Sequence, residues 1–174
     1  MKKLVVTITL AAFPLFVGHL AAQQNNANRL KTADSNFADK AAQGGMAEVE
    51  LGKMATQHAQ NAKVKQFGQR MVDDHTKIND QLKSIATNKA LTLPASLDSK
   101  DESEKNKLSS LQGEAFDKAY MEDMVSDHEK DIADFQHEAN HGDDPDIKAF
   151  AQKTLPTLQT HLQLAKDALA DVKK

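Results

Sequence analysis

A seven-residue pattern that occurs twice constrains this 174-residue chain more than any other feature. Residues 71–77 and 124–130 share Met-Val-x-Asp-His-x-Lys, with five of seven positions identical. Apolar residues recur around each copy at steps of three and four, the spacing of one face of an α-helix. Each copy therefore places a histidine, His75 or His128, where an amphipathic helix normally buries an apolar side chain.

Four segments with this periodicity predict long helices over about residues 34–60, 61–88, 114–141 and 145–172. Asp34 or Ser35 is the predicted N-cap of the first, and Asp144 followed by Pro145 predicts the start of the last. Between helices two and three, a connection of about 25 residues predicts a crossover along the length of the molecule, with a short charged surface helix near 98–107. The sequence therefore predicts an all-α fold, a four-helix bundle of two helical hairpins. The predicted core contains Phe37, Phe67, Ile78, Leu82, Met124, Phe135, Phe150, Leu158 and Leu162.

The N-terminal residues are typical of an export signal. Lys2 and Lys3 precede an apolar run, and small residues end it at Ala22, which predicts a signal peptide over 1–22, a flexible polar lead-in over 23–33 and a helical domain over 34–174. An uncleaved membrane anchor is the alternative. With no cysteine, the chain has neither a disulfide nor a lipid anchor on cysteine. We expect an exported protein, periplasmic or associated with the outer membrane, whose mature chain has no membrane-spanning segment.

The formal net charge is -3, and no basic face is evident, so the sequence argues against nucleic acid as a partner. Protein partners are not indicated. The chain has no glycine-rich phosphate loop, no cysteine nucleophile and no serine-histidine-acid grouping, so it offers no catalytic constellation beyond a candidate metal site.

Four polar residues interrupt the apolar faces of the predicted helices: Glu48, His75, His128 and His161. Each falls within about three residues, or roughly 4.5 Å of rise, of the midpoint of its own helix. Midpoints of packed helices stay level whether neighbours run parallel or antiparallel. We therefore expect these four side chains to meet at one layer in the core.

Two interpretations satisfy such a layer. In the first, it binds a transition-metal ion such as zinc, iron, copper or nickel, through three imidazoles and a carboxylate. Affinity would then fall as the pH drops below about 6.5, because protonated imidazole cannot bind metal. In the second, the layer is a structural cluster in which Glu48 accepts hydrogen bonds from histidines. Asp74 and Asp127, each preceding a layer histidine, either orient an imidazole or are solvated acids.

Several motifs together resemble an exported bacterial family catalogued as domain of unknown function 4142, over about residues 36 to 170. They are Gly44 to Lys53, Arg70 to Lys77, Ala119 to Met121, Met124 to Lys130, and Thr154-Leu155-Pro156-Thr157-Leu158 with His161. The resemblance implies the ferritin-like superfamily, hence a four-helix bundle with a long crossover; some members are labelled outer-membrane proteins. Di-iron members of that superfamily carry Glu-x-x-His. Here Val72, Val125 and Leu158 stand three residues before the layer histidines, so the resemblance does not extend to a di-iron centre or to ferroxidase activity.

Two functions follow from these patterns. One is an exported ferritin-like protein that binds a transition metal in its core, for metal buffering or stress protection. The other is a structural or interaction module whose buried layer only fixes helix packing. A metal-dependent oxidoreductase has less support, because no substrate pocket can be inferred from the sequence.

Overall fold

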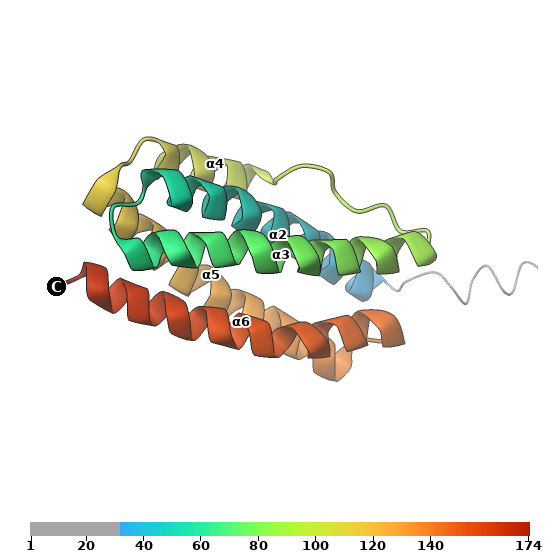
Figure 1. Cartoon of the computed structure of the whole chain (residues 1–174). Coiled ribbons are helices and arrows are strands. Elements are labelled where there is room, and N and C mark those ends of the chain that lie inside the picture. Colours follow the sequence, from blue (N-terminus) through green and yellow to red (C-terminus); the bar gives the residue numbers. More distant parts are fainter. Residues whose placement is uncertain (1–31) are drawn as a thin grey trace, which may run out of the picture.

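The computed structural model describes residues 32–174, and within that range the chain is entirely helical, with five α-helices and no strand (Figure 1). The helices are α2 (Thr32–His58), α3 (Ala62–Asn88), α4 (Ser99–Ser109), α5 (Gly113–His141) and α6 (Pro145–Val172). The predicted all-α class is confirmed, and the four long helices begin and end within two residues of the predicted limits. The short charged helix in the connection is α4. The predicted signal peptide and nearly all of the lead-in lie outside the described residues.

Side-chain caps explain where three of the helices begin. The carboxamide of Asn61 accepts a hydrogen bond from the backbone N–H of Lys63 at the start of α3. Asp144 accepts from two backbone N–H groups at the start of α6, where Pro145 has no N–H that would need an acceptor. At the start of α4, the carboxylate of Asp98 accepts from the backbone N–H of Asp101. These caps satisfy N–H groups that have no partner within their own helix.

Asp34 is not the N-cap that the sequence predicts. It lies inside α2, buried, and its carboxylate accepts from the backbone N–H groups of Asp143 and Asp144 at 3.2 and 2.9 Å, in the turn between α5 and α6. At the opposite end of the molecule, buried Asp117 of α5 accepts from the N–H groups of Gln60 and Asn61, in the turn between α2 and α3. Each turn is therefore held by an acid from the other pair of helices.

The long helices pack as two antiparallel hairpins. α2 packs mainly against α3 and α5 mainly against α6, while α3–α6 and α2–α5 contacts join the hairpins. The connection from 89 to 112 runs the length of the molecule (Figure 1): it begins where Lys89 pairs with Asp144, and it ends where the carbonyl of Leu111 contacts the ring of His58. Consequently α3 and α5 run in the same direction, and α4 lies over α2 and α5.

Two apolar clusters fill the core, one toward each end. The first contains Phe67, Met71, Phe116, Tyr120 and Met124, and the second contains Phe37, Leu82, Phe135, Phe150 and Leu158, with smaller residues completing both. Of the nine predicted core residues, seven are buried, whereas Ile78 and Leu162 are only half-buried. The four layer residues, Glu48, His75, His128 and His161, are all buried and come from the middle of their helices, between the two clusters.

Glycines set the distance between α2 and α3. A Cβ added at Gly52 would lie 2.6 Å from the carbonyl oxygen of Gly68, and one added at Gly68 would lie 2.8 Å from that of Gly52. The two backbones therefore approach too closely for any side chain at this level. Gly45 likewise faces the side chain of Asn79 on α3, which agrees with the close approach that a glycine pair suggests, but a Cβ at its neighbour Gly44 would meet no atom within 4 Å.

We expect Gly52→Ala to destabilise the protein and Gly44→Ala to stabilise it. Both glycines are inside α2, so alanine gains about 0.5–1 kcal/mol of helix propensity at either position. At position 52 the new methyl group also forces α2 away from α3, at a cost of roughly 1–3 kcal/mol. Urea denaturation of the two variants beside the wild type measures both effects, and equal free energies of unfolding would contradict the close approach.

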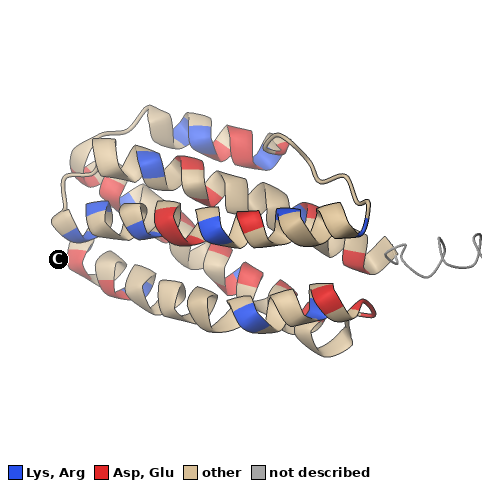
Figure 2. Cartoon of the chain, turned by 45° about the vertical axis from the view of Figure 1, so that its right-hand side comes forward, with Lys and Arg blue, Asp and Glu red and all other residues tan. Residues whose placement is uncertain are grey.

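The outer faces of the helices are charged. Acidic and basic positions are interspersed along α3 and α4 (Figure 2), as expected for solvated surface. Between residues 32 and 174, none of the helices combines the length and the apolar character that crossing a membrane requires.

Candidate metal centre

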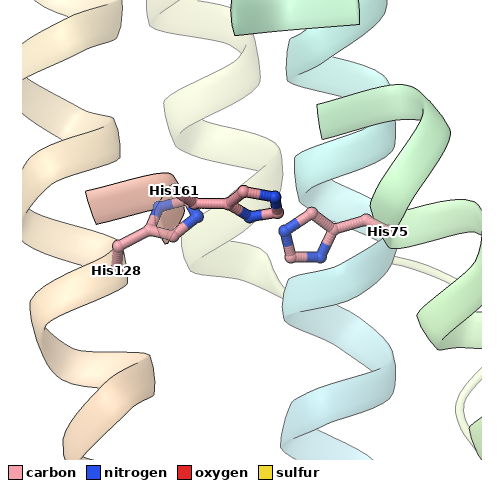
Figure 3. A group of neighbouring side chains, drawn as sticks. All are labelled: His75, His128 and His161. Atoms are coloured by element: carbon pink, nitrogen blue, oxygen red, sulfur yellow. The ribbon is translucent and has the colours of Figure 1, made fainter. Parts of the chain in front are cut away.

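Three histidines from three helices meet in the core. His75 of α3, His128 of α5 and His161 of α6 each present one ring nitrogen, and these nitrogens all lie within 4.8 Å of one another (Figure 3). Their ring centroids are 5.3 to 6.0 Å apart, and at most 3% of any of the three residues is exposed. We call His75, His128 and His161 the histidine triad. The expectation that mid-helix histidines converge is thus confirmed.

Every ring of the triad keeps one nitrogen without a hydrogen-bond partner. These buried atoms are Nε2 of His75, Nε2 of His128 and Nδ1 of His161. A buried polar atom without a partner costs free energy, and proteins normally pair such atoms. Three such atoms in one layer are therefore a departure from ordinary packing.

The opposite nitrogens of two rings are fixed by the protein. Nδ1 of His128 donates to the backbone carbonyl of Met124, one turn earlier in α5, at 2.9 Å. Nε2 of His161 lies 3.1 Å from a carboxylate oxygen of Asp74, which is half-buried on α3. With a proton on these nitrogens, the unpaired nitrogens carry free lone pairs. This is the usual arrangement of histidines that bind metal, since the second nitrogen commonly donates to a carbonyl or a carboxylate.

Burial keeps the triad neutral. It lowers the pKa of His75 well below 6.5, with further lowering from the charges of His128 and His161, and it lowers the pKa of His128 to about 4. Burial also lowers the pKa of His161, although its hydrogen bond to Asp74 offsets part of that effect. At neutral pH the three imidazoles are therefore unprotonated, as metal binding requires.

Asp74 remains ionised beside His161. Burial acts to raise the pKa of this carboxyl, but the hydrogen bond and charge of His161, together with the charges of Arg70 and Lys77, outweigh it and lower the pKa. The two basic side chains lie 3.8 and 3.6 Å from its oxygens.

Glu48 is buried in the same layer but approaches from another side. Its Oε1 lies 3.5 Å from Nδ1 of His128, the nitrogen that donates to Met124, and its Oε2 has no partner. It is not among the side chains whose ligand atoms all lie within 4.8 Å of one another. Burial, and next the charge of Asp131, raises its pKa well above the usual value. That Glu48 is itself a ligand stays a prediction.

The two acids that precede layer histidines have different surroundings. Asp74 contacts His161, whereas Asp127 pairs with Lys100 of α4 at 3.3 Å, near the surface. Sequence reasoning did not single out the carbonyl of Met124 or the buried hydroxyl of Tyr120, whose oxygen also has no partner. A carbonyl four residues before a buried helical histidine is a signal that could have been used. For Tyr120 the only signal was its place in an apolar face.

The donor set of the triad fits a transition-metal ion. Neutral imidazoles suit zinc, copper, nickel and iron, and three protein ligands leave a fourth position for a carboxylate or an exchangeable ligand. Nitrogens bound to one tetrahedral ion at 2.0–2.1 Å lie about 3.3–3.4 Å apart. Separations of up to 4.8 Å therefore require the rings to close in by roughly 1 Å.

Comparison with known proteins gives a family without an assigned activity. The model of a family described as "Domain of unknown function (DUF4142)" matches residues 19–168. No curated protein matches the chain.

Two solved structures are similar to this fold. A DUF305 fragment from Deinococcus radiodurans has a TM-score of 0.73 at 12% sequence identity, covering 82% of this chain and 99% of that one. A DUF305 protein from Streptomyces coelicolor, provisionally described as secreted, has a TM-score of 0.69 at 15% identity, covering 84% and 96%. At such identities the likeness concerns the fold alone.

Proposed function

The chain belongs to the family described as domain of unknown function 4142, and from that premise we propose that it is an exported protein that binds one transition-metal ion through the histidine triad. Its role would be metal buffering or protection against metal stress. The ligands are His75, His128 and His161, with Glu48 as a fourth ligand, and Asp74 orients the ring of His161.

The observation that carries this proposal is the set of three unpaired ring nitrogens in one buried layer. A layer that served only packing would lower its free energy by pairing these atoms or by replacing them with apolar groups. A bound ion, in contrast, accounts for all three at once.

Two further parts of the proposal concern the fold and the location of the protein. We propose that the four long helices form a ferritin-like bundle, since they pack as two hairpins with a connection along the whole molecule. Export is supported by the N-terminal sequence, where two lysines precede an apolar run that ends in small residues.

Elemental analysis tests metal binding directly. The untagged protein, purified from the compartment in which its host places it, should contain about one transition-metal ion per chain. The exposed rings of His137 and His141, with centroids 5.0 Å apart, are another place where imidazoles could collect metal, so His141→Ala is the control and should keep the full content. Metal-free protein that gains no thermal stability from zinc, copper, nickel or iron would overturn the proposal and favour the structural layer.

We expect protons to compete only weakly with metal for the three imidazoles between pH 7.5 and 5.5. Exposed imidazoles with a pKa of 6.5 would each be about one-tenth neutral at pH 5.5, so an exposed triad would lose about a thousandfold in affinity. Burial lowers the pKa of all three rings, to about 4 for His128, so protons compete with metal only at lower pH. The threshold near 6.5 expected from sequence alone therefore moves down, and protonation of the three imidazoles should lower the affinity by less than about tenfold.

Chelator-competition titrations at pH 7.5, 6.5 and 5.5 would measure this dependence, with circular dichroism at each pH to show that the helices persist. A thousandfold loss by pH 5.5 would mean that the rings titrate like exposed imidazoles.

A further inference from the structure

A cavity of about 320 Å³ extends from the surface to His75, one residue of the histidine triad. It lies between α2 and α5, next to the start of α4. Its lining includes exposed side chains, such as Lys40 and Asp98, and also buried ones, His75 and Glu48. We call it the entrance cavity. It extends from the interface between the two hairpins to the layer that holds the proposed metal site.

The entrance cavity is predominantly acidic. Among its lining residues, acidic side chains outnumber lysines by eight to three, and one of those lysines, Lys100, is already paired with Asp127. Burial, and then repulsion from Asp127, raises the pKa of Asp131 to about 7, while burial and the neighbouring Asp123 raise that of Glu104 to about 7. Carboxyl groups crowded in this way lower their mutual repulsion when a cation lies among them.

At its inner end the cavity meets two unpaired atoms. Oε2 of Glu48 and Nε2 of His75 are both buried without a hydrogen-bond partner, and both residues line the cavity. Only 4% of Glu48 is exposed. A carboxyl oxygen therefore lies between the acidic lining and the first ring of the triad.

We propose that a divalent cation reaches the histidine triad through the entrance cavity, attracted by its acids and contacting Glu48 last before His75. This inference rests on the proposed function. Among residues 32–174, the triad is the group whose ligand atoms are close enough to share one ion. The carboxylates of the cavity therefore act mainly by attracting the cation electrostatically. The acids of the cavity should therefore control the rate of metal uptake more than its affinity.

Gly44 offers a way to obstruct this route. It lines the entrance cavity, and a Cβ built on it meets no atom within 4 Å, so a larger side chain can project there without displacing the core. An obstacle on a route slows entry and exit by the same factor, because the equilibrium between bound and free metal does not depend on the path. A change at a ligand, in contrast, alters the affinity.

Stopped-flow mixing of metal-free protein with Zn²⁺ tests the route. We expect Gly44→Phe to slow both binding and release by about tenfold or more while the dissociation constant stays within about twofold of the wild type. Gly44→Ala is the matched control and should bind at the wild-type rate. Equal rates for the two variants, or a changed dissociation constant with an unchanged binding rate, would overturn the inference.

A charge variant provides a second test that needs no added volume. At pH 8, above the pKa of about 7 of Asp131, Asp131→Asn should slow Zn²⁺ binding several-fold at low ionic strength, with the difference shrinking as salt is added. Asp80→Asn, an exposed acid of α3 outside the cavity lining, is its control and should have little effect. If Asp131→Asn matches Asp80→Asn at every ionic strength, the acids do not guide the ion. If Zn²⁺ fails to bind the wild type at all, this inference and the proposed function are both wrong. If the wild type binds Zn²⁺ tightly but the variants bind it at the wild-type rate, only the inference is wrong.

Discussion

Replacing His128 by alanine should abolish specific metal binding. The ring of His128 is fully buried, its Nδ1 is held by the carbonyl of Met124, and its Nε2 is free to bind an ion. Losing one of the three imidazole ligands should lower the affinity by more than the roughly 10–100-fold that follows from losing a group that only orients a ligand. A chelator-competition titration with Zn²⁺ measures the loss.

Thermal denaturation separates this effect from general destabilisation. At a free metal concentration of 100 times the dissociation constant, binding stabilises the wild type by about 2.7 kcal/mol, which for a domain of this size raises Tm by roughly 5–10 °C. His128→Ala should lose this increment. His128→Leu, which restores most of the buried volume, should lose it too and keeps the test valid if the alanine variant unfolds. A purely structural layer predicts the opposite: metal leaves the wild-type Tm unchanged, and His128→Ala is equally destabilised with and without metal.

Asp74→Ala should weaken metal binding by about 10–100-fold without abolishing it. The carboxylate of Asp74 holds Nε2 of His161 at 3.1 Å, so its loss frees the ring to rotate and leaves a buried nitrogen without a partner. The remaining ligands are intact. The change should appear mainly as faster metal release, because the acids that attract the ion are unaltered.

Asp73 provides the control for this variant. It precedes Asp74 on the same helix, is exposed, and accepts a hydrogen bond from Gln69. Asp73→Ala removes the same charge from the same turn of α3 without touching the triad, so it should leave the affinity nearly unchanged. Similar losses in the two variants would mean that Asp74 acts through its charge alone.

Helix limits and the depth of the layer could be predicted from the sequence because both depend on local patterns. Asn61 and Asp144-Pro145 mark helix starts whatever surrounds them, and a histidine at the middle of an amphipathic helix must lie at mid-depth. The sequence determines less well the direction in which each side chain points around its helix axis. The periodicity placed Glu48 in the correct layer, but it could not show that its carboxylate would approach Nδ1 of His128 and not the free Nε2.

The two copies of the repeated motif show the same limit more sharply. Asp74 and Asp127 occupy equivalent positions in it, yet Asp74 faces α6 and Asp127 faces α4. The difference arises from α4, which covers α2 and α5 and brings Lys100 to Asp127. Packing between distant segments also decided the close approach of Gly52 and Gly68 and the shape of the entrance cavity. No pattern within a single helix carries that information.

The acids that hold the two turns have a consequence for how the chain tolerates change. Asp34 and Asp117 are 83 positions apart, and the same offset relates Gln60 to Asp143 and Asn61 to Asp144, the residues whose N–H groups they bind. Val64 and Ile147, and Phe67 and Phe150, have this spacing as well. Each helical hairpin thus supplies an acid that binds the turn of the other, as equivalent residues do in a two-fold symmetric dimer. The segment 89–112 links the two hairpins. A substitution at either acid therefore loosens the half of the molecule in which it does not lie, so neither half can diverge independently of the other.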